Sequence, residues 1–482
     1  MVHQYKLNGY NVVLDVYSGA IHVVDDVAYD IIRLFCDKNA VPELDEVKAA
    51  FPELSDEDAG ECYGDICELI EDGKLFTEDE FRPNAGVLKN RNSDIKALCL
   101  HVSHACDLTC SYCFAGQGRF NGPSALMSID VAKRAIDFLV ENSGGRKNLE
   151  VDFFGGEPLL NFDVVKETVA YARSIEEKEG KNFRFTLTTN GMGINDEVID
   201  FANRECHNVV LSLDGRKEIH DRERRTAGGE GSYDIIVPKF QKLVHERTCK
   251  AVSKNKNYYI RGTFTHYNPD FTNDLYHMVD LGFTELSMEP VVCDPKSRFA
   301  LTEEDLPILL DEYEKLAVEM LRRENVSRDT DCELAGSDTP FTFYHYMLDL
   351  GHGPCIYKRI SGCGSGTEYF AVTPKGELYP CHQFVGDEKY LMGDIWKGIS
   401  ESRAAGAEKS GAEIRDEFKM CNVYARTECD DCWAKLYCSG GCAANAYHAT
   451  GDILGVYDYG CRLFRKRIEC AIMMQVARYE NQ

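Results

Sequence analysis

Strand-like and helix-like stretches alternate along residues 95–295, and this pattern constrains the fold more than any other feature of the sequence. Apolar runs with helical spacing lie between short runs rich in β-branched and aromatic residues. Repeated strand–helix units favour a parallel sheet covered by helices, which right-handed crossovers curl into a barrel. We therefore expect an α/β fold, a partial (β/α)6 TIM barrel. The predicted strands are 97–102, 149–154, 183–189, 208–213, 258–265 and 284–290, and the predicted helices are 128–142, 163–178, 195–204, 232–247 and 270–281.

A cysteine-rich loop follows the first predicted strand. It holds Cys106, Cys110 and Cys113 in the pattern C-x3-C-x2-C, with Tyr112 before the last cysteine. In βα barrels the chemistry lies at the carboxyl ends of the strands, which is where this loop is expected. Three thiolates at this spacing can hold three corners of a four-iron cluster and leave the fourth open to a small molecule. Zinc fits less well, because structural zinc takes four protein ligands. The alternative is a cysteine-rich loop that binds no metal.

Polar or glycine-rich segments follow the next three predicted strands. Paired glycines let the backbone approach a ligand closely, and a carboxylate beside them can receive an ammonium group. The alternative for each segment is an ordinary turn or strand-end cap. The residues are Gly155, Gly156, Glu157 and Pro158 after the second strand, Thr189 and Asn190 after the third, and Ser212 and Asp214 after the fourth.

Taken together, these segments resemble the signature of the radical S-adenosylmethionine (SAM) enzymes. The resemblance implies that Cys106, Cys110 and Cys113 hold a [4Fe-4S] cluster whose open iron binds the amino and carboxylate groups of SAM. Electron transfer would then cleave SAM to a 5′-deoxyadenosyl radical, which removes hydrogen from an unactivated carbon.

The same resemblance implies the contacts of SAM itself. The Gly155–Pro158 segment would receive the SAM amino group, and Tyr112 would lie beside the adenine. Thr189, Asn190, Ser212 and Asp214 would line the ribose and the substrate face. Arg224 would contact the SAM carboxylate, with the adjacent Arg225 as the alternative assignment.

Seven further cysteines near the carboxyl end resemble the SPASM extension of some radical SAM enzymes, which carries two auxiliary [4Fe-4S] clusters. Together with the first cluster this implies three clusters. The resemblance assigns Cys429, Cys432, Cys438 and Cys461 to an outer cluster and Cys363, Cys381 and Cys442 to an inner one. Cys355 either completes the inner cluster or leaves an iron open to a substrate thiolate. The competing interpretation is a zinc ribbon built on Cys429, Cys432, Cys438 and Cys442.

The first 90 residues form a predicted module of their own. Strands are expected at 11–16 and 20–24, helices at 26–34, 44–51 and 56–72, and a wing strand at 74–77. This order favours a small winged helix, and similar modules (RRE-like) in peptide-modifying enzymes bind a leader peptide as an added strand. The alternative is a packing cap without a ligand. The expected domains are thus 1–90, a radical SAM barrel at 95–295, a helical linker at 296–350 and a SPASM domain at 351–482.

Charge and composition limit the partners. The net charge of −26 disfavours nucleic acid and anionic membranes and favours a basic or neutral peptide. No apolar run approaches the roughly 20 residues of a membrane span, and the first residues lack a signal-peptide core, so we expect a soluble, cytoplasmic protein. The 21 cysteines then indicate metal or redox ligands rather than a disulfide framework.

Three stretches, 13–26, 362–369 and 379–386, resemble one subgroup, the maturases of cysteine-rich SCIFF peptides, of the ranthipeptide and sactipeptide type. These enzymes install thioether bridges between a cysteine sulfur and a carbon of another residue. The resemblance implies a Cys-rich ribosomal (RiPP) precursor whose leader is bound by the N-terminal module, and reduced ferredoxin or flavodoxin as electron donor.

Other functions stay open at this point. They are carbon–carbon cross-linking, epimerisation and sulfatase-type formylglycine formation. His382 follows Cys381 where sulfatase maturases carry a general-base aspartate, which weighs against the last of these. Two different classes are an electron-transfer or cluster-storage protein without a substrate and a zinc-bound DNA regulator.

Overall fold

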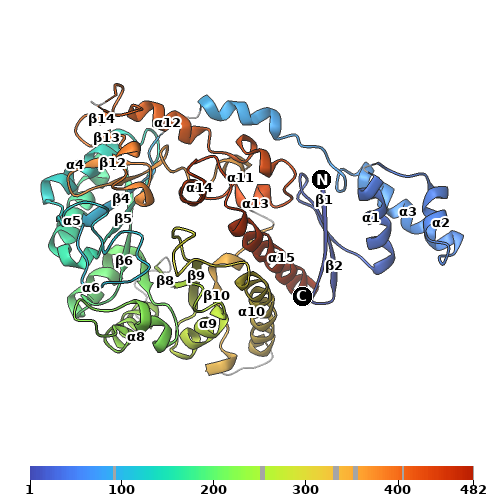
Figure 1. The fold of residues 1–482 in the computed structure, drawn as a ribbon, viewed down its shortest axis with the longest axis horizontal. Coiled ribbons are helices and arrows are strands. Elements are labelled where there is room, and N and C mark those ends of the chain that lie inside the picture. The colour runs from blue at the N-terminus through green and yellow to red at the C-terminus, as the bar shows by residue number, and fades with distance from the viewer. Residues whose placement is uncertain are drawn as a thin grey trace.

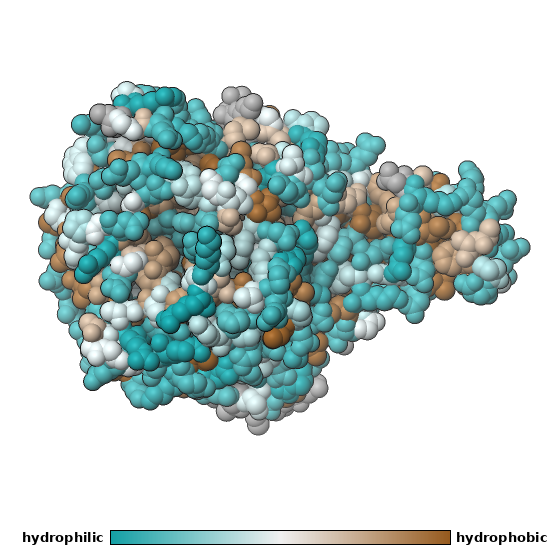
Figure 2. Space-filling view, in the orientation of Figure 1, coloured by the Kyte–Doolittle hydropathy of each residue, from teal (hydrophilic) through white to brown (hydrophobic). Residues whose placement is uncertain are grey.

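The computed structural model describes residues 1–38, 40–90, 94–249, 256–328, 336–350, 356–403 and 406–480. A large α/β body forms one end of the molecule, and a small lobe built from the first residues projects from the other (Figure 1). Part of the C-terminal region, including its long last helix, lies between them (Figure 1). Figure 2 shows that the visible face is mostly hydrophilic, in keeping with the acidic composition. Within the described ranges, no helix is both long and apolar enough to cross a membrane.

Six parallel strands form the body in their order along the chain: β4 (Ala97–Ser103), β5 (Asn148–Gly155), β6 (Asn182–Thr189), β7 (Cys206–Ser212), β8 (Asn257–Phe264) and β9 (Glu285–Pro290). The helices between them are α4 (Ile129–Glu141), α5 (Phe162–Glu179), α6 (Asp196–Glu205), a short α7 (Lys217–Glu223), α8 (Tyr233–Cys249) and α9 (Phe271–Asp280). The predicted parallel α/β architecture is confirmed.

The two faces of these strands differ in polarity. On β5 and β6 the residues that face the helices are buried and apolar, as with Phe153 and Phe185, whose rings stack at 5.8 Å. The alternate residues are at least partly exposed, and all but Phe154 are polar, among them Asp152 and Thr186. Because side chains alternate along a strand, one polar row per strand faces the inside of the curled sheet. The barrel interior is therefore suited to hold a polar ligand.

The sheet continues into the C-terminal region on both edges. β11 (Tyr369–Val372) pairs in parallel with β4 and leads to β12 (Glu377–Tyr379), β13 (Gly393–Asp394) and β14 (Gly398–Ile399). At the other edge, β10 (Thr342–Phe343) pairs with β9. One hydrogen-bonded sheet of eleven strands thus crosses both domain boundaries expected at 296 and 351.

The N-terminal lobe contains an antiparallel sheet, β1 (Val2–Leu7), β2 (Tyr10–Asp15) and β3 (Ile21–Val23), and the helices α1 (Asp26–Lys38), α2 (Leu44–Ala50) and α3 (Asp56–Glu71). β1 was not predicted, and the wing strand expected at 74–77 is absent. The backbone N–H groups of Lys74 and Thr77 bond to partners other than the backbone of a strand. Lys74 N donates to Leu69 O at the end of α3 (2.9 Å), and Thr77 N donates to Asp15 Oδ2 (3.1 Å).

Two long helices join the parts of the molecule. α10 (Asp305–Arg328) packs against α15 (Asp458–Glu480), which also contacts β1, where Tyr5 Oη donates to Glu469 O at 3.0 Å. The remaining helices are α11 (Ile356–Ser361), α12 (Gly411–Lys419), α13 (Lys435–Cys438) and α14 (Ala443–Thr450). Short 3-10 helices are η1 (Arg82–Asn90), η2 (Pro158–Asn161), η3 (Gly336–Asp338), η4 (Tyr344–Tyr346), η5 (His382–Phe384), η6 (Glu388–Tyr390), η7 (Val423–Ala425) and η8 (Thr427–Cys429).

Candidate active site

One cavity at the carboxyl ends of the barrel strands gathers most of the residues that the sequence singled out. It is lined by Cys106, Cys110, Tyr112, Cys113, Gly155, Gly156, Glu157, Thr189, Asn190, Ser212 and Arg224. Two of the predicted SAM-contact residues do not line it. Pro158 is buried at the first position of η2, and Asp214 lies behind Arg224. Segments far apart in the sequence therefore line one cavity.

The two glycines after β5 are required by the packing of the cysteine loop. A Cβ on Gly155 would lie 2.2 Å from Ser103 O, and a Cβ on Gly156 would lie 2.2 Å from Ala105 O. Gly155 also has a φ of +125°, which a residue with a side chain rarely adopts. The loop carrying Cys106 thus rests directly on the bare backbone of the glycine segment.

Glu157 stabilises the packing of the cysteine loop on the glycine segment. Its carboxylate accepts hydrogen bonds from Thr189 Oγ1 (2.8 Å), Asn190 N (2.8 Å) and Leu159 N (3.0 Å). The side chain is almost fully buried, and burial raises its pKa to about 7 despite these donors. Asn190 in turn donates to Asp107 Oδ1 at 2.7 Å, which ties the cysteine loop to the end of β6. The sequence predicts that Glu157 receives an ammonium group. In the structure its carboxylate already accepts three hydrogen bonds from the protein.

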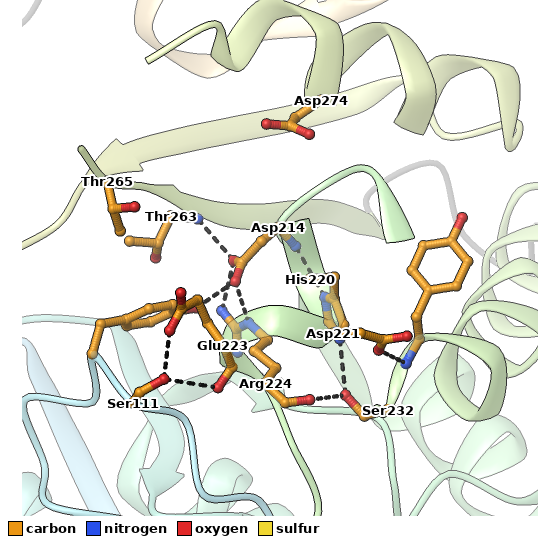
Figure 3. Close-up of polar contacts among 12 residues, drawn as sticks. Ser111, Asp214, His220, Asp221, Glu223, Arg224, Ser232, Thr263, Thr265 and Asp274 are labelled. Carbon is orange, nitrogen blue, oxygen red and sulfur yellow. Dashed lines mark hydrogen bonds and ion pairs between the residues drawn. The ribbon is translucent and has the colours of Figure 1, made fainter. Parts of the chain in front are cut away.

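Arg224 and Asp214 form a buried ion pair beside the cysteine loop (Figure 3). Arg224 Nε and Nη2 donate to the two oxygens of Asp214 at 2.8 and 3.0 Å, and Tyr112 Oη donates to Asp214 Oδ2 at 2.5 Å. The guanidinium also lies 5.6 Å from the centre of the Tyr112 ring. Although burial opposes ionisation, the charge of Arg224 holds the pKa of Asp214 below its usual value. Arg224 lines the cavity, and its third guanidinium nitrogen, Nη1, makes neither of the two bonds to Asp214.

His220 and Ser232 support this ion pair through a chain of hydrogen bonds (Figure 3). Asp214 N donates to His220 Nδ1 at 3.3 Å, so the ring proton is on Nε2, which lies 2.9 Å from Ser232 Oγ. Ser232 Oγ donates to Arg224 O at 2.7 Å. Burial lowers the pKa of His220 to about 4, in keeping with a neutral ring. These hydrogen bonds hold the backbone of both Asp214 and Arg224 in place.

Sequence reasoning missed the far wall of the cavity. Arg261 and Glu289, from β8 and β9, line it together with His382 and Gln383 from the C-terminal region. The alternation along β8 could have indicated that Arg261 lies in the cavity. The buried residues of this strand are Tyr258, Ile260, Gly262 and Phe264, and the residues between them face the barrel interior. No local signal placed His382 there, because its position depends on the pairing of β11 with β4.

The C-terminal cysteines form two groups. In one, burial raises the pKa of Cys438 to about 12, and the neighbouring thiols of Cys461, Cys429 and Cys432 act in the same direction. In the other, burial raises the pKa of Cys381, and Cys442 and Cys363 add to the effect. Cys442 thus lies with Cys363 and Cys381, which disfavours a zinc ribbon. Cys355 lies outside the described residues.

Cys421, which sequence reasoning did not single out, also lies within electrostatic range of Cys363. Its thiol donates to Ile453 O at 3.9 Å. Within the described part of the chain, no three His, Cys, Asp or Glu side chains converge closely enough to hold a single metal ion.

Comparison with known proteins identifies the central segment. Residues 100–263 match the model of the Radical SAM superfamily. The central part of this chain is a radical SAM enzyme domain. The family implies SAM and an iron–sulfur cluster, and the residues present fit both groups. Three thiols line one cavity, and the bare backbone of Gly155 and Gly156 borders it.

The chain is also similar to a sulfatase-maturating enzyme and to two solved structures with bound SAM. A cysteine-type anaerobic sulfatase-maturating enzyme of Clostridium novyi (strain NT) is 23% identical over 361 residues, which are 71% of this chain and 86% of the relative. A solved structure, native anSMEcpe with bound AdoMet, is 20% identical with a TM-score of 0.61 and covers 80% of this chain and 100% of that one. Streptococcus suis SuiB bound to S-adenosylmethionine is 13% identical with a TM-score of 0.50, covering 93% and 96%. The two structures support the fold of the radical SAM domain.

Proposed function

We propose that this protein is a radical SAM peptide maturase of the SCIFF type, which forms thioether cross-links between a cysteine sulfur and a carbon of an acceptor residue in a Cys-rich ribosomal peptide. One observation carries the proposal. The cavity that contains Cys106, Cys110 and Cys113 is also lined by His382 and Gln383, directly after Cys381 of the inner cysteine group. A peptide in this cavity would therefore reach both the SAM side and a second set of thiol ligands.

The cofactor residues follow from this placement. Cys106, Cys110 and Cys113 would hold the cluster of the radical SAM domain, and the backbone of Gly155 and Gly156 would border SAM. When bound, the cluster and SAM supply one-electron chemistry that produces a hydrogen-abstracting radical. Arg224, which lines the cavity, would bind the SAM carboxylate through Nη1 while Asp214 holds the rest of the guanidinium in place.

Two auxiliary clusters in a SPASM domain are part of the proposal. Cys429, Cys432, Cys438 and Cys461 would hold the outer cluster, and Cys363, Cys381 and Cys442 the inner one. The grouping of these thiols supports that division. An inner cluster with only these three protein ligands would leave one iron open to the substrate thiolate. Cys355, as a fourth ligand, would close that position.

A leader peptide has an open edge available in the N-terminal lobe. Asp15 N donates to Ala20 O and Val24 N donates to Asn11 O, so residues 20, 22 and 24 face β2. The backbone groups of Ile21 and Val23 therefore point away from β2, along the outer edge of β3. At the opposite edge, β1 packs against α15. We propose that the leader adds to β3 as a further strand.

The proposed reaction replaces one S–H and one C–H bond by a C–S bond, so the peptide loses two hydrogen atoms. The test is anaerobic reconstitution of the enzyme with SAM, a reductant and a Cys-rich precursor peptide encoded beside it. We expect a loss of two hydrogens per bridge and a sulfur that iodoacetamide no longer alkylates. A peptide lacking the donor cysteine should show neither change, and an undiminished mass loss in that peptide would reject the thioether.

Formylglycine formation is the second candidate, and the similarity to the sulfatase-maturating enzyme of Clostridium novyi favours it. The products separate the candidates. Epimerisation leaves the mass unchanged, and a carbon–carbon cross-link removes two hydrogens but leaves every thiol open to alkylation. Formylglycine formation from cysteine removes the sulfur altogether.

A further inference from the structure

The far wall of the cavity carries an arginine that the proposed cofactors do not use. Arg261 projects from β8 with 53% of its side chain exposed, and it lines the same cavity as the three cysteines. Its register partner on β7 is Ser212, and its partner on β9 is Ser287. The nearest carboxylate is that of Glu289, whose Oε1 is 4.0 Å from Arg261 Nη2, beyond hydrogen-bond distance. The guanidinium thus lies in the cavity at the outer distance limit of an ion pair with Glu289.

The carboxylate of Glu289 is already engaged by other groups. His345 Nε2 lies 3.0 Å from Glu289 Oε1, and Ser287 Oγ donates to the same oxygen at 3.3 Å. Arg467 from α15 is a further cation beside Glu289. Although burial opposes ionisation, His345, Arg261 and Arg467 lower the pKa of Glu289 to about 2.

Two guanidinium groups, those of Arg261 and Arg467, act on the carboxylate of Glu289. Burial lowers the pKa of His345, which favours its neutral form at pH 7. Arg467 Nε and Nη1 are buried and have no hydrogen-bond partner within the described residues. Of the two arginines, Arg261 lines the cavity, and its exposed side chain can bind an anionic ligand there.

We infer that Arg261 binds a carboxylate of the substrate peptide, from an Asp or Glu side chain, and so positions the reacting residue. The inference rests on the proposed peptide substrate. A planar guanidinium can bind a carboxylate through two parallel hydrogen bonds, which fixes orientation as well as affinity.

The carboxylate of SAM is the other possible source, and the position of Arg224 argues against it. Arg224 stands beside Tyr112 and close to Cys110, on the side of the cysteine loop, so it is the arginine expected at the SAM carboxylate. Arg261 lines the same cavity together with His382, which follows Cys381. Arg261 is therefore available for a second carboxylate, that of the peptide.

Binding measurements on the reconstituted enzyme test the inference. Each Asp and Glu of a fluorescein-labelled Cys-rich precursor peptide is changed in turn to Asn or Gln, and the dissociation constants are measured by fluorescence anisotropy in the presence of SAM. We expect one such amide peptide to bind the wild-type enzyme about 10- to 100-fold more weakly than the parent peptide, as for loss of a charged hydrogen bond. Arg261→Gln should bind the parent peptide equally weakly and should no longer distinguish it from that amide peptide.

Controls separate this role from folding and from SAM binding. Arg261→Lys keeps the charge but loses the paired geometry and should give an intermediate affinity. Arg204→Gln changes an exposed arginine on the outer helix α6 and should bind all peptides as the wild type does. The SAM dissociation constant should be the same for the wild type and Arg261→Gln.

Two results would overturn the inference. One is a wild-type enzyme that binds every amide peptide as tightly as the parent, whether or not a thioether forms. The other is an Arg261→Gln enzyme whose SAM affinity falls while its preference among the peptides is unchanged. Failure of the proposed function is distinct from both, since it consists of peptide binding without a thioether product.

Discussion

Lys435 and Asp79 lie 356 positions apart in the sequence and form an ion pair, with Lys435 Nζ 3.3 Å from Asp79 Oδ2. Lys435 is 1% exposed and also donates to Tyr17 Oη (3.1 Å) and Asp430 O (3.2 Å). Asp79 accepts a further bond from Tyr424 Oη at 2.8 Å. Because Lys435 stands between Cys432 and Cys438, the N-terminal lobe is anchored directly on one of the two cysteine groups.

Replacing Lys435 by Met should loosen the N-terminal lobe. The change removes the buried cation of Asp79 and leaves Arg82, whose Nε is 3.9 Å from Asp79 Oδ2, as the remaining one, which costs about 1 to 3 kcal/mol of folding stability. We expect a lower temperature of unfolding and faster proteolysis in the segment around residues 72–82. Lys397→Met, at an exposed lysine, is the matched control. Equal proteolysis of the two variants would show that the ion pair does not hold the lobe.

Gly156→Ala should disturb the cysteine loop and reduce iron binding. The added Cβ would lie 2.2 Å from Ala105 O and 2.6 Å from Ala105 C, both backbone atoms, so the loop must move. We expect the purified, reconstituted variant to lose about four iron atoms, the content of one cluster. Gly145→Ala is the control, because a Cβ there meets no atom within 4 Å. A full iron content and an unchanged electron paramagnetic resonance spectrum in Gly156→Ala would contradict the prediction.

The grouping of the C-terminal cysteines predicts that Cys429→Ser and Cys442→Ser affect different metal centres. Three four-iron clusters correspond to about twelve iron atoms per chain, and each variant should retain about eight or more. Their spectra should differ, because Cys429 belongs with Cys432 and Cys461, whereas Cys442 belongs with Cys363. Cys249→Ser, at an exposed cysteine, is the control. Identical losses in both variants, with zinc in place of iron, would favour the zinc ribbon.

Glu157 should make stability depend on pH in a defined direction. Burial raises its pKa from 4.5 to about 7, so the folded state holds this proton more tightly than the unfolded state. The stability that Glu157 contributes is complete below pH 4.5 and is lost as the pH rises toward 7. The stability of the wild type relative to Glu157→Gln should therefore fall by about 1.4 kcal/mol per pH unit across this window.

Unfolding by denaturant at a series of pH values measures this difference. Glu177→Gln, on the exposed side of α5, is the matched control, and its difference from the wild type should stay flat over the same range. A wild-type stability that rises between pH 5 and 7 relative to Glu157→Gln would mean that the three hydrogen bonds to the carboxylate outweigh its burial.

The barrel and one part of the site were predictable because their signals are local. Alternation of period two along β5, β6 and β8 and helical spacing between the strands depend only on neighbouring residues. The cysteine spacing of Cys106, Cys110 and Cys113 is likewise contained in one loop. Since parallel strands end at one edge, the segments after β4, β5, β6 and β7 had to converge there.

The wing strand at 74–77 shows where local signals fail. The apolar run there was compatible with a strand, but the donors of Lys74 and Thr77 found partners in Leu69 and Asp15. Which partner a backbone group finds depends on what the rest of the chain brings near it.

By itself, then, the sequence determined the order of the six barrel strands and the edge of the sheet at which Cys106, Cys110 and Cys113 lie. Only the tertiary structure decided that β11 joins β4, that Arg224 is clamped by Asp214 and that Arg261 faces the cavity beside His382. The physical reason is that a period of two or of 3.6 is set by neighbours along the chain. A partner that is distant in sequence is selected by packing and charge among surfaces that exist only once the chain has folded.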